Sequence, residues 1–292
     1  MMNIVIIGCG YLGQRVARYY LETGHSVTAV VRTAASAAKL QSAGISAIAL
    51  DLDLAQPEAY PLTMKGAELF YFAPPPKTGV KESRIARLLD QLGEGNHPKR
   101  IVYLSTTGVY GDCGGDWVDE TRPANPVVDR ARRRWDGEQQ FRAWRQATGG
   151  ELVVLRVAGI YGPGKLPLAR LRRQEPMVRE SEAPYTNRIH ISDLVQSCVA
   201  AMARGVSGEI YNVSDGSPGN MTDYFNQVAD WAGLPRPAQI ALDAAGSQLS
   251  AGMLSYLQES RRLDSRKLQR ELGVVMNYPD LQRGLAACRS EG

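Results

Sequence analysis

The stretch Ile4-Val5-Ile6-Ile7-Gly8-Cys9-Gly10-Tyr11-Leu12-Gly13 decides the fold of this chain. Its first four residues form an apolar, β-branched run, which predicts a buried strand. Three glycines follow with the spacing G-x-G-x-x-G, and an amphipathic pattern begins directly behind them. This order predicts a tight turn and the start of a helix, as in the first unit of a dinucleotide-binding α/β domain.

Each glycine of this motif has its own physical reason. Gly8 permits the sharp turn off the strand, and Gly10 lets a pyrophosphate approach the backbone because it has no side chain. Gly13 lets the helix pack closely on the strand. The N–H groups and the dipole of the helix start then face the phosphates. We therefore predict cofactor binding at Gly8, Gly10, Tyr11, Leu12 and Gly13; the alternative is a glycine-rich turn that binds nothing.

The net charge, the cysteine and histidine counts and the length of the apolar runs exclude several classes of protein. A net charge of only +4 argues against a dedicated nucleic-acid-binding protein, which concentrates basic charge on one face. Four cysteines without C-x-x-C spacing are typical of free thiols in a reducing compartment, and the three histidines lack metal-ligand spacing. The chain enters a core strand at once, which leaves no room for a signal peptide, and no apolar run reaches the length of a membrane span. We expect a cytoplasmic protein without a metal, a nucleic-acid partner or a membrane partner.

The pattern of elements predicts a Rossmann-type doubly wound parallel sheet with a smaller C-terminal substrate lobe. We assign residues 1–165 to the dinucleotide-binding domain and 166–292 mainly to the lobe, with a strand over 209–213 returning to the sheet. After the first strand, further strands are predicted over 26–31, 45–50, 69–72, 101–104 and 152–157. Helices are predicted over 11–23, 34–43, 81–92, 127–147, 192–204, 222–232, 247–260, 264–272 and 280–288, and a loop over 93–98.

The end of the second predicted strand carries information on the cofactor. A Rossmann fold that prefers NAD places an Asp or Glu there to hold the ribose 2′-OH. This chain has Arg32, followed by Thr33 and Ser36. A guanidinium with two hydroxyls suits a 2′-phosphate, so we predict NADP in preference to NAD. The alternative is a solvated arginine at a strand end.

The next two strand ends are predicted to complete the cofactor groove. Asp51 and Leu52 follow the third strand, where the carboxylate would lie at the adenine edge. Ala73 and Pro74 begin a proline-rich run after the fourth strand, and this run cannot continue as a strand because proline lacks an N–H. Loops at the carboxyl ends of strands build the site in an open α/β sheet, so we expect these four residues to wall the groove.

Five separate segments occur in an order that points to one family. They are Gly8-x-Gly10-x-x-Gly13, the run from Leu104 to Gly111, the run from Leu155 to Gly164, the run from Asn187 to Asp193, and Tyr211-Asn212-Val213 with Asp215-Gly216. With these motifs the chain resembles the extended branch of the short-chain dehydrogenase/reductases, the NAD(P)-dependent epimerase/dehydratases. The resemblance covers residues 1 to about 216.

The resemblance implies oxidoreductase or epimerase/dehydratase chemistry on a small polar substrate such as a nucleotide sugar. It also implies a catalytic set of Ser or Thr, Tyr and Lys, in which the Ser/Thr role falls on Thr106. Family members often dimerise through a four-helix contact, which here would use the helices near 81–92 and 127–147. A homodimer is therefore the oligomer that the resemblance suggests.

The chain departs from the family at the Tyr-x-x-x-Lys motif. Glu138 matches the family's acidic residue four positions after the Lys, which places the Lys position at Arg134 and the Tyr position at Arg130. Arg134 could still hold a ribose hydroxyl as a fixed cation. An arginine cannot shuttle a proton near neutral pH, because its pKa lies above about 12.

Three explanations for this departure compete. Tyr110 or Tyr161 could replace the missing phenol if a nearby cation lowered its pKa from about 10. The substrate could be an anion that Arg130 and its neighbours bind. The protein could also bind NADP(H) without turnover, as a sensor or scaffold. Arg132 and Arg133 are expected to point away from the face that Arg130 and Arg134 share, so at least half of the cluster is expected to be solvated.

His190 lies in the run that resembles the family's Ile-His-x-x-Asp segment. A lone histidine without ligand spacing is more often packed or capping than a base, and we predict that role for it.

Overall fold

A seven-stranded parallel sheet forms the centre of the computed structural model, which describes residues 1–54, 62–92 and 95–290. β1 pairs in parallel with β2 and β4, β2 with β3, and β4 with β5. The strand order is β12-β7-β5-β4-β1-β2-β3. The strands are β1 (Asn3–Ile7), β2 (Ser26–Val31), β3 (Ala47–Ala49), β4 (Glu68–Tyr71), β5 (Arg100–Thr106), β7 (Glu151–Val157) and β12 (Ile210–Val213). The predicted fold class is confirmed, and the strand predicted over 209–213 does join the sheet.

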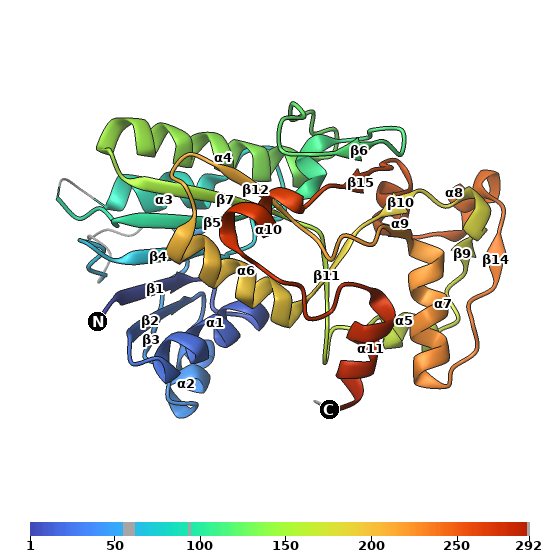
Figure 1. Cartoon of the computed structure of the whole chain (residues 1–292), viewed down its shortest axis with the longest axis horizontal. Helices are drawn as coiled ribbons and strands as arrows, with labels where there is room; N and C mark the ends of the chain where they lie inside the picture. Colours follow the sequence, from blue (N-terminus) through green and yellow to red (C-terminus); the bar gives the residue numbers. More distant parts are fainter. Residues whose placement is uncertain (55–61, 93–94, 291–292) are drawn as a thin grey trace. The chain divides into compact units, whose positions relative to one another are not determined.

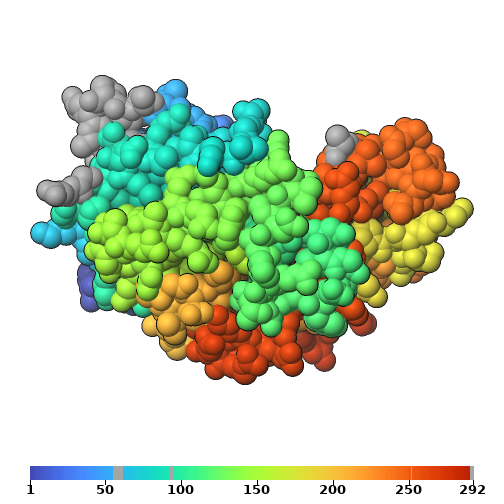
Figure 2. All heavy atoms as spheres, turned by 90° about the horizontal axis from the view of Figure 1, so that it is seen from above, coloured from blue at the N-terminus to red at the C-terminus, as the bar shows by residue number. Residues whose placement is uncertain are grey.

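Helices cover both faces of this sheet. α1 (Tyr11–Glu22) and α2 (Ala34–Ser42) lie on one face, and α3 (Ser83–Gln91) and α4 (Asp129–Thr148) lie on the other (Figure 1). In Figure 2, α4 in yellow-green and the α3 region in teal lie side by side on one outer face. Because both faces are covered, β1 is a continuous apolar run and Ile4 to Ile7 are buried. Residues 93 and 94 of the predicted loop lie outside the described residues.

The chain divides into two compact units. Unit 1 comprises residues 1–109, 129–156 and 195–211, and unit 2 comprises 110–128, 157–194 and 212–292. The prediction placed a boundary near residue 165 and returned the strand over 209–213 to the sheet; the structure also assigns 195–208 to unit 1 and 110–128 to unit 2. The sequence did not show that these segments change unit, since each is short and has no composition shift at its ends.

Unit 2 consists of short elements around its own apolar core. That core includes Tyr161, Met177, Phe225, Val228 and Leu285. The strands are β6 (Trp117–Val118), β8 (Gly159–Tyr161), β9 (Met177–Val178), β10 (Tyr185–Thr186), β11 (Arg188–His190), β13 (Gly219–Asn220), β14 (Gln239–Ile240) and β15 (Arg262–Leu263). The helices from α5 on are α5 (Leu168–Arg172), α6 (Ile191–Arg204), α7 (Met221–Ala232), α8 (Ala245–Gln248), α9 (Ala251–Leu257), α10 (Arg266–Leu272) and α11 (Leu281–Ser290), of which α6 is shared by both units.

Two predicted helices differ from the structure. The helix predicted over 247–260 is two helices, α8 and α9, because the Ser250 hydroxyl caps a new start by accepting from the N–H of Met253 at 3.4 Å. The helix predicted over 264–272 begins at Arg266, since Arg262 and Leu263 form β15. No helix in the described part of the chain is both long and apolar enough to cross a membrane.

A buried ion pair joins three elements of unit 1. Nη2 of Arg156 on β7 lies 2.8 Å from Oε2 of Glu138 on α4, and Nε of Arg156 lies 3.1 Å from Oε1. The Ser105 hydroxyl at the end of β5 donates to the same Oε1 at 2.6 Å. Both charged side chains are almost fully enclosed, at 2% and 0% exposure. Glu138, Ser105 and Arg156 each lie in or beside a family motif, and here they fix α4 to the sheet.

Arg156→Met tests this network. We expect the variant to lose about 3–5 kcal/mol of unfolding free energy, because the Glu138 carboxylate would stay buried without its partner. Urea unfolding at pH 7 measures the loss. Adding Glu138→Gln should restore part of it, whereas Arg132→Met, which removes an exposed arginine of α4, should cost about 0–1 kcal/mol. A loss below about 1 kcal/mol for Arg156→Met would contradict this account.

Candidate functional site

The Gly8 turn brings the ends of two neighbouring strands together. Gly8 has φ +89°, and a Cβ atom there would lie 2.3 Å from the backbone N of Ala73 at the end of β4. No other residue fits this position, because the backbone of Ala73 cannot retreat as a flexible side chain could. At Gly13 a Cβ would lie 3.1 Å from the Gly8 carbonyl oxygen and 3.2 Å from Cγ2 of Ile6. The close helix-to-strand packing predicted for Gly13 is confirmed.

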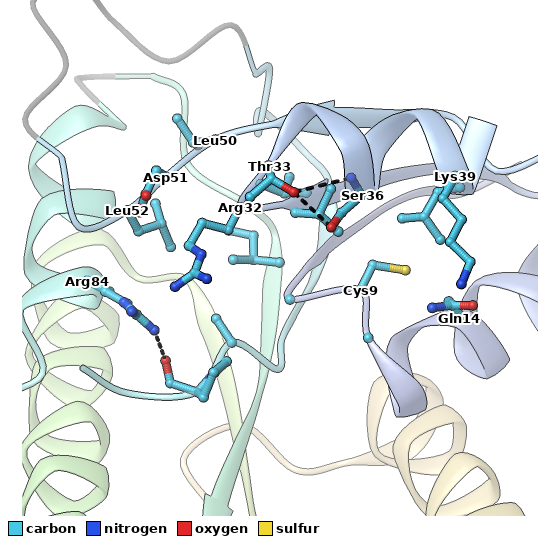
Figure 3. Close-up of a pocket in the computed structure, with 18 residues that line it drawn as sticks. Cys9, Gln14, Arg32, Thr33, Ser36, Lys39, Leu50, Asp51, Leu52 and Arg84 are labelled. Carbon is cyan, nitrogen blue, oxygen red and sulfur yellow. Dashed lines mark hydrogen bonds between the residues drawn. The ribbon is translucent and has the colours of Figure 1, made fainter. Parts of the chain in front are cut away.

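A cavity of about 560 Å³ opens at this turn, within unit 1 (Figure 3). Its volume lies in the range of sites for small molecules and cofactors. Nine of the predicted cofactor residues line it: Gly8, Gly10, Arg32, Thr33, Ser36, Asp51, Leu52, Ala73 and Pro74. Cys9, Gln14, Lys39, Leu50 and Arg84 also line it. The predicted groove therefore exists as a cavity with the predicted walls.

Three predicted cofactor residues do not line the cavity. Leu12 is buried in the core, and the Arg15 guanidinium lies over the Tyr11 ring at 4.1 Å from its centroid. Gly13 packs against β1 as described above. A role of their backbone N–H groups toward phosphates stays a prediction. Gly10 is open, because a Cβ there would meet nothing within 4 Å.

One end of the cavity is cationic. Arg32 follows the last residue of β2 and is exposed, and no carboxylate of the described residues lies within ion-pair distance of it. Thr33 caps α2: its hydroxyl oxygen accepts from the Ser36 N–H at 3.2 Å, and the hydroxyl donates to Oγ of Ser36 at 2.9 Å. Lys39 stands one helical turn after Ser36 and lines the same cavity (Figure 3). The sequence analysis missed Lys39, although the i, i+3 spacing from Ser36 could have shown it.

Another part of the cavity wall is held by Arg84, which the sequence analysis also missed. Nε of Arg84 donates to Oδ1 of Asp53 at 2.7 Å, and its Nη2 forms an ion pair with Oδ2. Nη1 of Arg84 donates to the Pro74 carbonyl at 2.6 Å. The hydrogen bond from Arg84 lowers the pKa of Asp53. Arg84 thus ties the loop after β3 to the loop after β4 and keeps Leu50, Leu52 and Pro74 around one space.

Two arginines of α4 hold the same proline-rich loop. Nη1 of Arg134 donates to the Ala73 carbonyl at 3.1 Å, and Nη1 of Arg133 donates to the Gly79 carbonyl. Arg133 is 7% exposed, so the expectation that it points to solvent was wrong. Arg132 is exposed as expected and pairs with Asp129 at 3.3 Å. The reason is local: prolines 74–76 offer carbonyl oxygens but no N–H groups, and arginine supplies the missing donors.

The predicted catalytic residues of unit 1 lie where β5 meets α4. Thr106 ends β5 and is partly exposed, and its Oγ1 accepts from the Gly108 N–H at 3.3 Å. A Cβ at Gly108 would lie 3.5 Å from Cβ of Ala131, so the first turn of α4 packs against this segment. Arg130, in the same turn, is half-buried. The structure thus brings Thr106, Arg130 and Arg134 to one region of unit 1.

The two candidate replacement phenols lie in the interior of unit 2. Tyr110 is 1% exposed, and its hydroxyl donates to Oδ1 of Asn212 at 2.7 Å. Nδ2 of Asn212 in turn donates to the Val118 and Asp264 carbonyls, both at 3.2 Å, which fixes the amide and the direction of the phenol proton. Burial raises the pKa of Tyr161, opposite to the lowering that the replacement requires. The structure therefore supports neither phenol as the proton donor.

His190 has the packing and capping role that was predicted for it. Its side chain is fully buried, and its Nδ1 accepts from the Ser192 N–H at 3.3 Å. All four cysteines are buried thiols outside any disulfide of the described residues. Within the described ranges, no group of three or more His, Cys, Asp or Glu side chains could hold a metal ion.

The comparisons with known proteins agree with the predicted family. The sequence profile of the NAD dependent epimerase/dehydratase family matches residues 77–214. The chain is 24% identical to Protein YeeZ of Escherichia coli K12, over 96% of this chain and 97% of that protein. It is also 24% identical to a 4-hydroxy-2-methyl-3-oxo-4-farnesyl-3,4-dihydroquinoline-1-oxide ketoreductase of Stigmatella aurantiaca, over 100% of this chain and 97% of the ketoreductase.

Solved structures show the same fold. A functionally unknown conserved protein from Silicibacter pomeroyi is 29% identical, with a TM-score of 0.85 over 100% of this chain and 99% of that one. UDP-glucuronic acid 4-epimerase from Bacillus cereus in complex with NAD is 17% identical, with a TM-score of 0.76 over 98% and 97% of the two chains. The resemblance inferred from the motifs is confirmed by the profile and by this shared fold.

A buried carboxyl group at the start of α3 provides a pH test of the loop architecture. Glu82 is fully enclosed; its Oε1 accepts from the Arg84 N–H at 3.2 Å, and its Oε2 has no hydrogen-bond partner among the described residues. Burial raises the pKa of Glu82 to about 7. The folded state therefore keeps a proton that the unfolded state releases above about pH 4.3. The stability that this group contributes is complete below about pH 4.3 and is lost as the pH rises through about 7.

We expect Glu82→Gln to be more stable than the natural chain at pH 8, by on the order of 1–3 kcal/mol, and the difference to vanish near pH 4. Urea unfolding at several pH values measures it. Glu22→Gln, at the exposed end of α1, is the control and should show no such trend. Equal stability of Glu82→Gln and the natural chain at pH 8 would refute the raised pKa.

Proposed function

We propose that this chain, in which residues 77–214 match the NAD dependent epimerase/dehydratase family, is an NADP(H)-dependent oxidoreductase of the epimerase/dehydratase or reductase type. Its substrate is a small polar molecule such as a nucleotide sugar. The observation that carries this proposal is the cavity at the Gly8 turn, which combines an open glycine backbone, an apolar pocket and a cationic end.

The cavity fits a dinucleotide part by part. Gly10 leaves the start of α1 open, where backbone N–H groups and the helix dipole favour a diphosphate. Leu50 and Leu52 offer an apolar surface for an adenine ring, with Asp51 available at its polar edge. These features support a dinucleotide of either kind.

The preference for NADP rests on the end of β2. No carboxylate stands at Arg32, Thr33 or Ser36 to accept a ribose 2′-OH, and the cations there suit a 2′-phosphate. Lys39 adds a further positive charge to the cavity lining, one helical turn after Ser36, and we include it in the proposed 2′-phosphate site. Its ammonium contributes as a point charge, whereas the Arg32 guanidinium can bind two phosphate oxygens at once.

The chemistry follows from the residues at the end of β5 and the start of α4. When bound, the cofactor supplies hydride transfer at nicotinamide C4. We propose that the Thr106 hydroxyl hydrogen-bonds the reacting oxygen of the substrate. Arg130 and Arg134 stabilise negative charge on the substrate or hold a ribose hydroxyl, because a guanidinium donates hydrogen bonds without losing its proton. The proton that balances the hydride step then comes from water.

Tyr110 does not enter this proposal as a proton donor, because its phenol is buried and directed at Asn212. The relatives support hydride chemistry without fixing the substrate: one is named a ketoreductase, and a protein of the same fold is a UDP-sugar epimerase in complex with NAD. Binding of NADP(H) without turnover on any substrate would instead support the sensor or scaffold role.

Arg32→Ala tests the cofactor preference. We expect it to weaken NADPH binding about tenfold or more, since a charged hydrogen bond contributes about 1.5–3 kcal/mol, and to change NADH binding little. Lys39→Ala should act in the same direction. Titration of NADPH fluorescence measures the affinities, and Arg18→Ala, on the exposed face of α1, is the matched control. Equal losses for both cofactors would refute the 2′-phosphate site.

Turnover of NADPH with a panel of UDP-sugars and small carbonyl compounds tests the catalytic assignment. We expect Arg134→Met to lower kcat about tenfold or more, because it removes a charge-assisted contact. Arg132→Met, which changes an exposed neighbour on α4, should leave kcat unchanged.

Tyr110→Phe should lower the unfolding free energy by about 1 kcal/mol through the lost hydrogen bond to Asn212, and the variant should keep its turnover. A folded Tyr110→Phe protein without turnover would return Tyr110 to the proton-donor role.

A further inference from the structure

Unit 2 contains a cavity of its own, of about 340 Å³, at the end of α10. It is lined by the last turn of α10, by the segment that follows this helix, and by Asp215 in the loop after β12 (Figure 1). All of its lining residues belong to unit 2, and none of them lines the cavity at the Gly8 turn. Its volume lies in the range of sites for small molecules, so this cavity can hold a ligand other than the dinucleotide.

The segment after α10 gives the cavity an apolar wall. Its residues on the lining are Val274, Val275, Met276 and Pro279. Val274 is buried, whereas Val275 is 72% exposed and stands at the opening. Covering such an exposed valine with a hydrocarbon chain removes apolar surface from water, which favours a ligand with an aliphatic part.

Hydrogen bonds fix this wall in place. The two carboxylate oxygens of Asp193 accept from the N–H groups of Asn277 and Tyr278, both at 2.9 Å. The Ser217 hydroxyl donates to the Pro279 carbonyl at 2.7 Å. The cavity is therefore formed before a ligand arrives, which reduces the entropy that is lost on binding.

Asp215 is the carboxyl group of the cavity, and one of its oxygens lacks a donor. The residue lines the cavity and is only 5% exposed. Its Oδ1 accepts from the Ser217 N–H at 2.9 Å. Among the described residues, none donates a hydrogen bond to Oδ2, and no cation lies within ion-pair distance of Asp215. A buried acceptor without a donor is costly, so a ligand that supplies the donor stabilises it.

The charges around Asp215 favour a cation. Asp193 and Asp280 act on its carboxyl group as like charges, and Arg188 acts as an opposite charge from beyond ion-pair distance. The neighbouring carboxylates thus outnumber the guanidinium. Within the described ranges, no group of three or more His, Cys, Asp or Glu side chains could hold a metal ion. The cation that fits is therefore an organic one, such as an ammonium.

The end of α10 adds to this preference. Gly273, at φ +61°, ends the helix, and its N–H donates to the Gln269 carbonyl at 3.0 Å. Both residues line the cavity, so the C-terminal end of the helix faces it. Carbonyl groups at a helix C-terminus carry a partial negative charge that favours cations. The exposed Gln269 side chain also offers an amide oxygen as an acceptor.

We propose that this cavity binds a primary ammonium group on a short aliphatic chain. The ammonium donates to Oδ2 of Asp215, and the chain lies along Val275, Met276 and Pro279. An ammonium has three donors and no acceptor, which suits an unpartnered carboxylate oxygen beside a helix C-terminus. The site goes beyond the proposed function, because it takes a second ligand in unit 2 whatever the cofactor cavity binds.

Binding of n-butylamine to the full chain tests this assignment, with butan-1-ol as the neutral probe of the same chain length. Affinities are measured by ligand-observed NMR titration at pH 8 and constant ionic strength. We expect butylammonium to bind about tenfold or more tightly than butanol, because a hydrogen bond between charged groups is stronger than a neutral one.

Asp215→Asn should abolish the preference for butylammonium, since the amide keeps an acceptor for the Ser217 N–H but loses the charge. Asp243→Asn is the matched control. It removes an exposed carboxylate of unit 2 that does not line the cavity, and it should bind both probes like the natural chain.

The pH dependence of binding distinguishes a bound ammonium from a purely structural effect. Burial raises the pKa of Asp215 to about 7. Of its neighbours, Asp193 and Asp280 oppose its ionisation and Arg188 favours it, while the raised pKa of Tyr161 keeps that phenol neutral. Butylamine stays protonated, so its affinity for the natural chain should fall about tenfold from pH 8 to pH 6 as Asp215 takes up a proton. The affinity of Asp215→Asn should not change over this range, and a pH-independent affinity of the natural chain would contradict the role of Asp215.

Nα-acetyl-lysine methylamide tells two sources of such a group apart, since it carries its ammonium as a lysine side chain of a protein does. Tighter binding than that of butylamine assigns a lysine of a partner protein, and weaker binding assigns a free amine.

Equal affinity of folded Asp215→Asn and the natural chain for butylammonium, or no preference of the natural chain for it over butanol, overturns the proposal. If Asp215→Asn fails to fold, Val275→Lys decides. Val275 is exposed, so this change preserves the fold and places a competing ammonium at the opening. Unchanged affinity of Val275→Lys for butylammonium refutes the site. NADPH takes no part in these titrations, so their failure leaves the proposed function untouched.

Discussion

The architecture of unit 1 depends on the contact between Gly8 and Ala73. The Gly8 N–H donates to the Val30 carbonyl on β2 at 2.9 Å, so the turn is fixed on one side by a backbone hydrogen bond. On its other side the backbone of Ala73 leaves no space for a side chain. These two contacts hold the carboxyl ends of β1, β2 and β4 side by side, so the loops that follow these strands surround a single cavity. The constraint is steric, and it explains why this position needs glycine whatever the ligand.

Arginine takes several distinct roles in this chain. In unit 1, Arg84, Arg133 and Arg134 donate to carbonyl oxygens of the loop after β4, which its prolines leave poor in donors. These bonds hold the wall of the cavity from the side of α3 and α4. The motif register of the sequence analysis predicts Arg134 at the family's lysine position, so the same side chain that supports the wall is also part of the proposed reaction site. Under the proposed function, Arg130 and Arg134 at the two predicted motif positions would supply charge stabilisation in place of proton exchange, because a guanidinium keeps its proton near neutral pH.

The sequence predicted the sheet, the glycine turn and nine residues of the cavity because these depend on local patterns: apolar runs, glycine spacing and strand ends. It did not predict Arg84, because its partner Asp53 lies 31 residues away, in a different loop. Arg133 was misjudged for a related reason: a buried guanidinium that binds a backbone carbonyl has the same sequence pattern as a solvated one. Tyr110 is a phenol in a family motif and so has the residue type of a proton donor. Its hydroxyl, however, donates a hydrogen bond to the Asn212 amide oxygen, which lies on a strand 102 positions later. Such long-range partners decide a side chain's role, and no window of sequence contains them.

The central claim is that the Gly8 turn holds a pyridine dinucleotide in the cavity beside it. Calorimetric titration of the full chain with NADPH, in a buffer without phosphate, tests this most directly. The account predicts saturable binding of one NADPH per chain, weakened when pyrophosphate competes for the open backbone at Gly10. Absence of measurable heat with both NADPH and NADH, at more than one temperature and with protein shown to be folded, would contradict it.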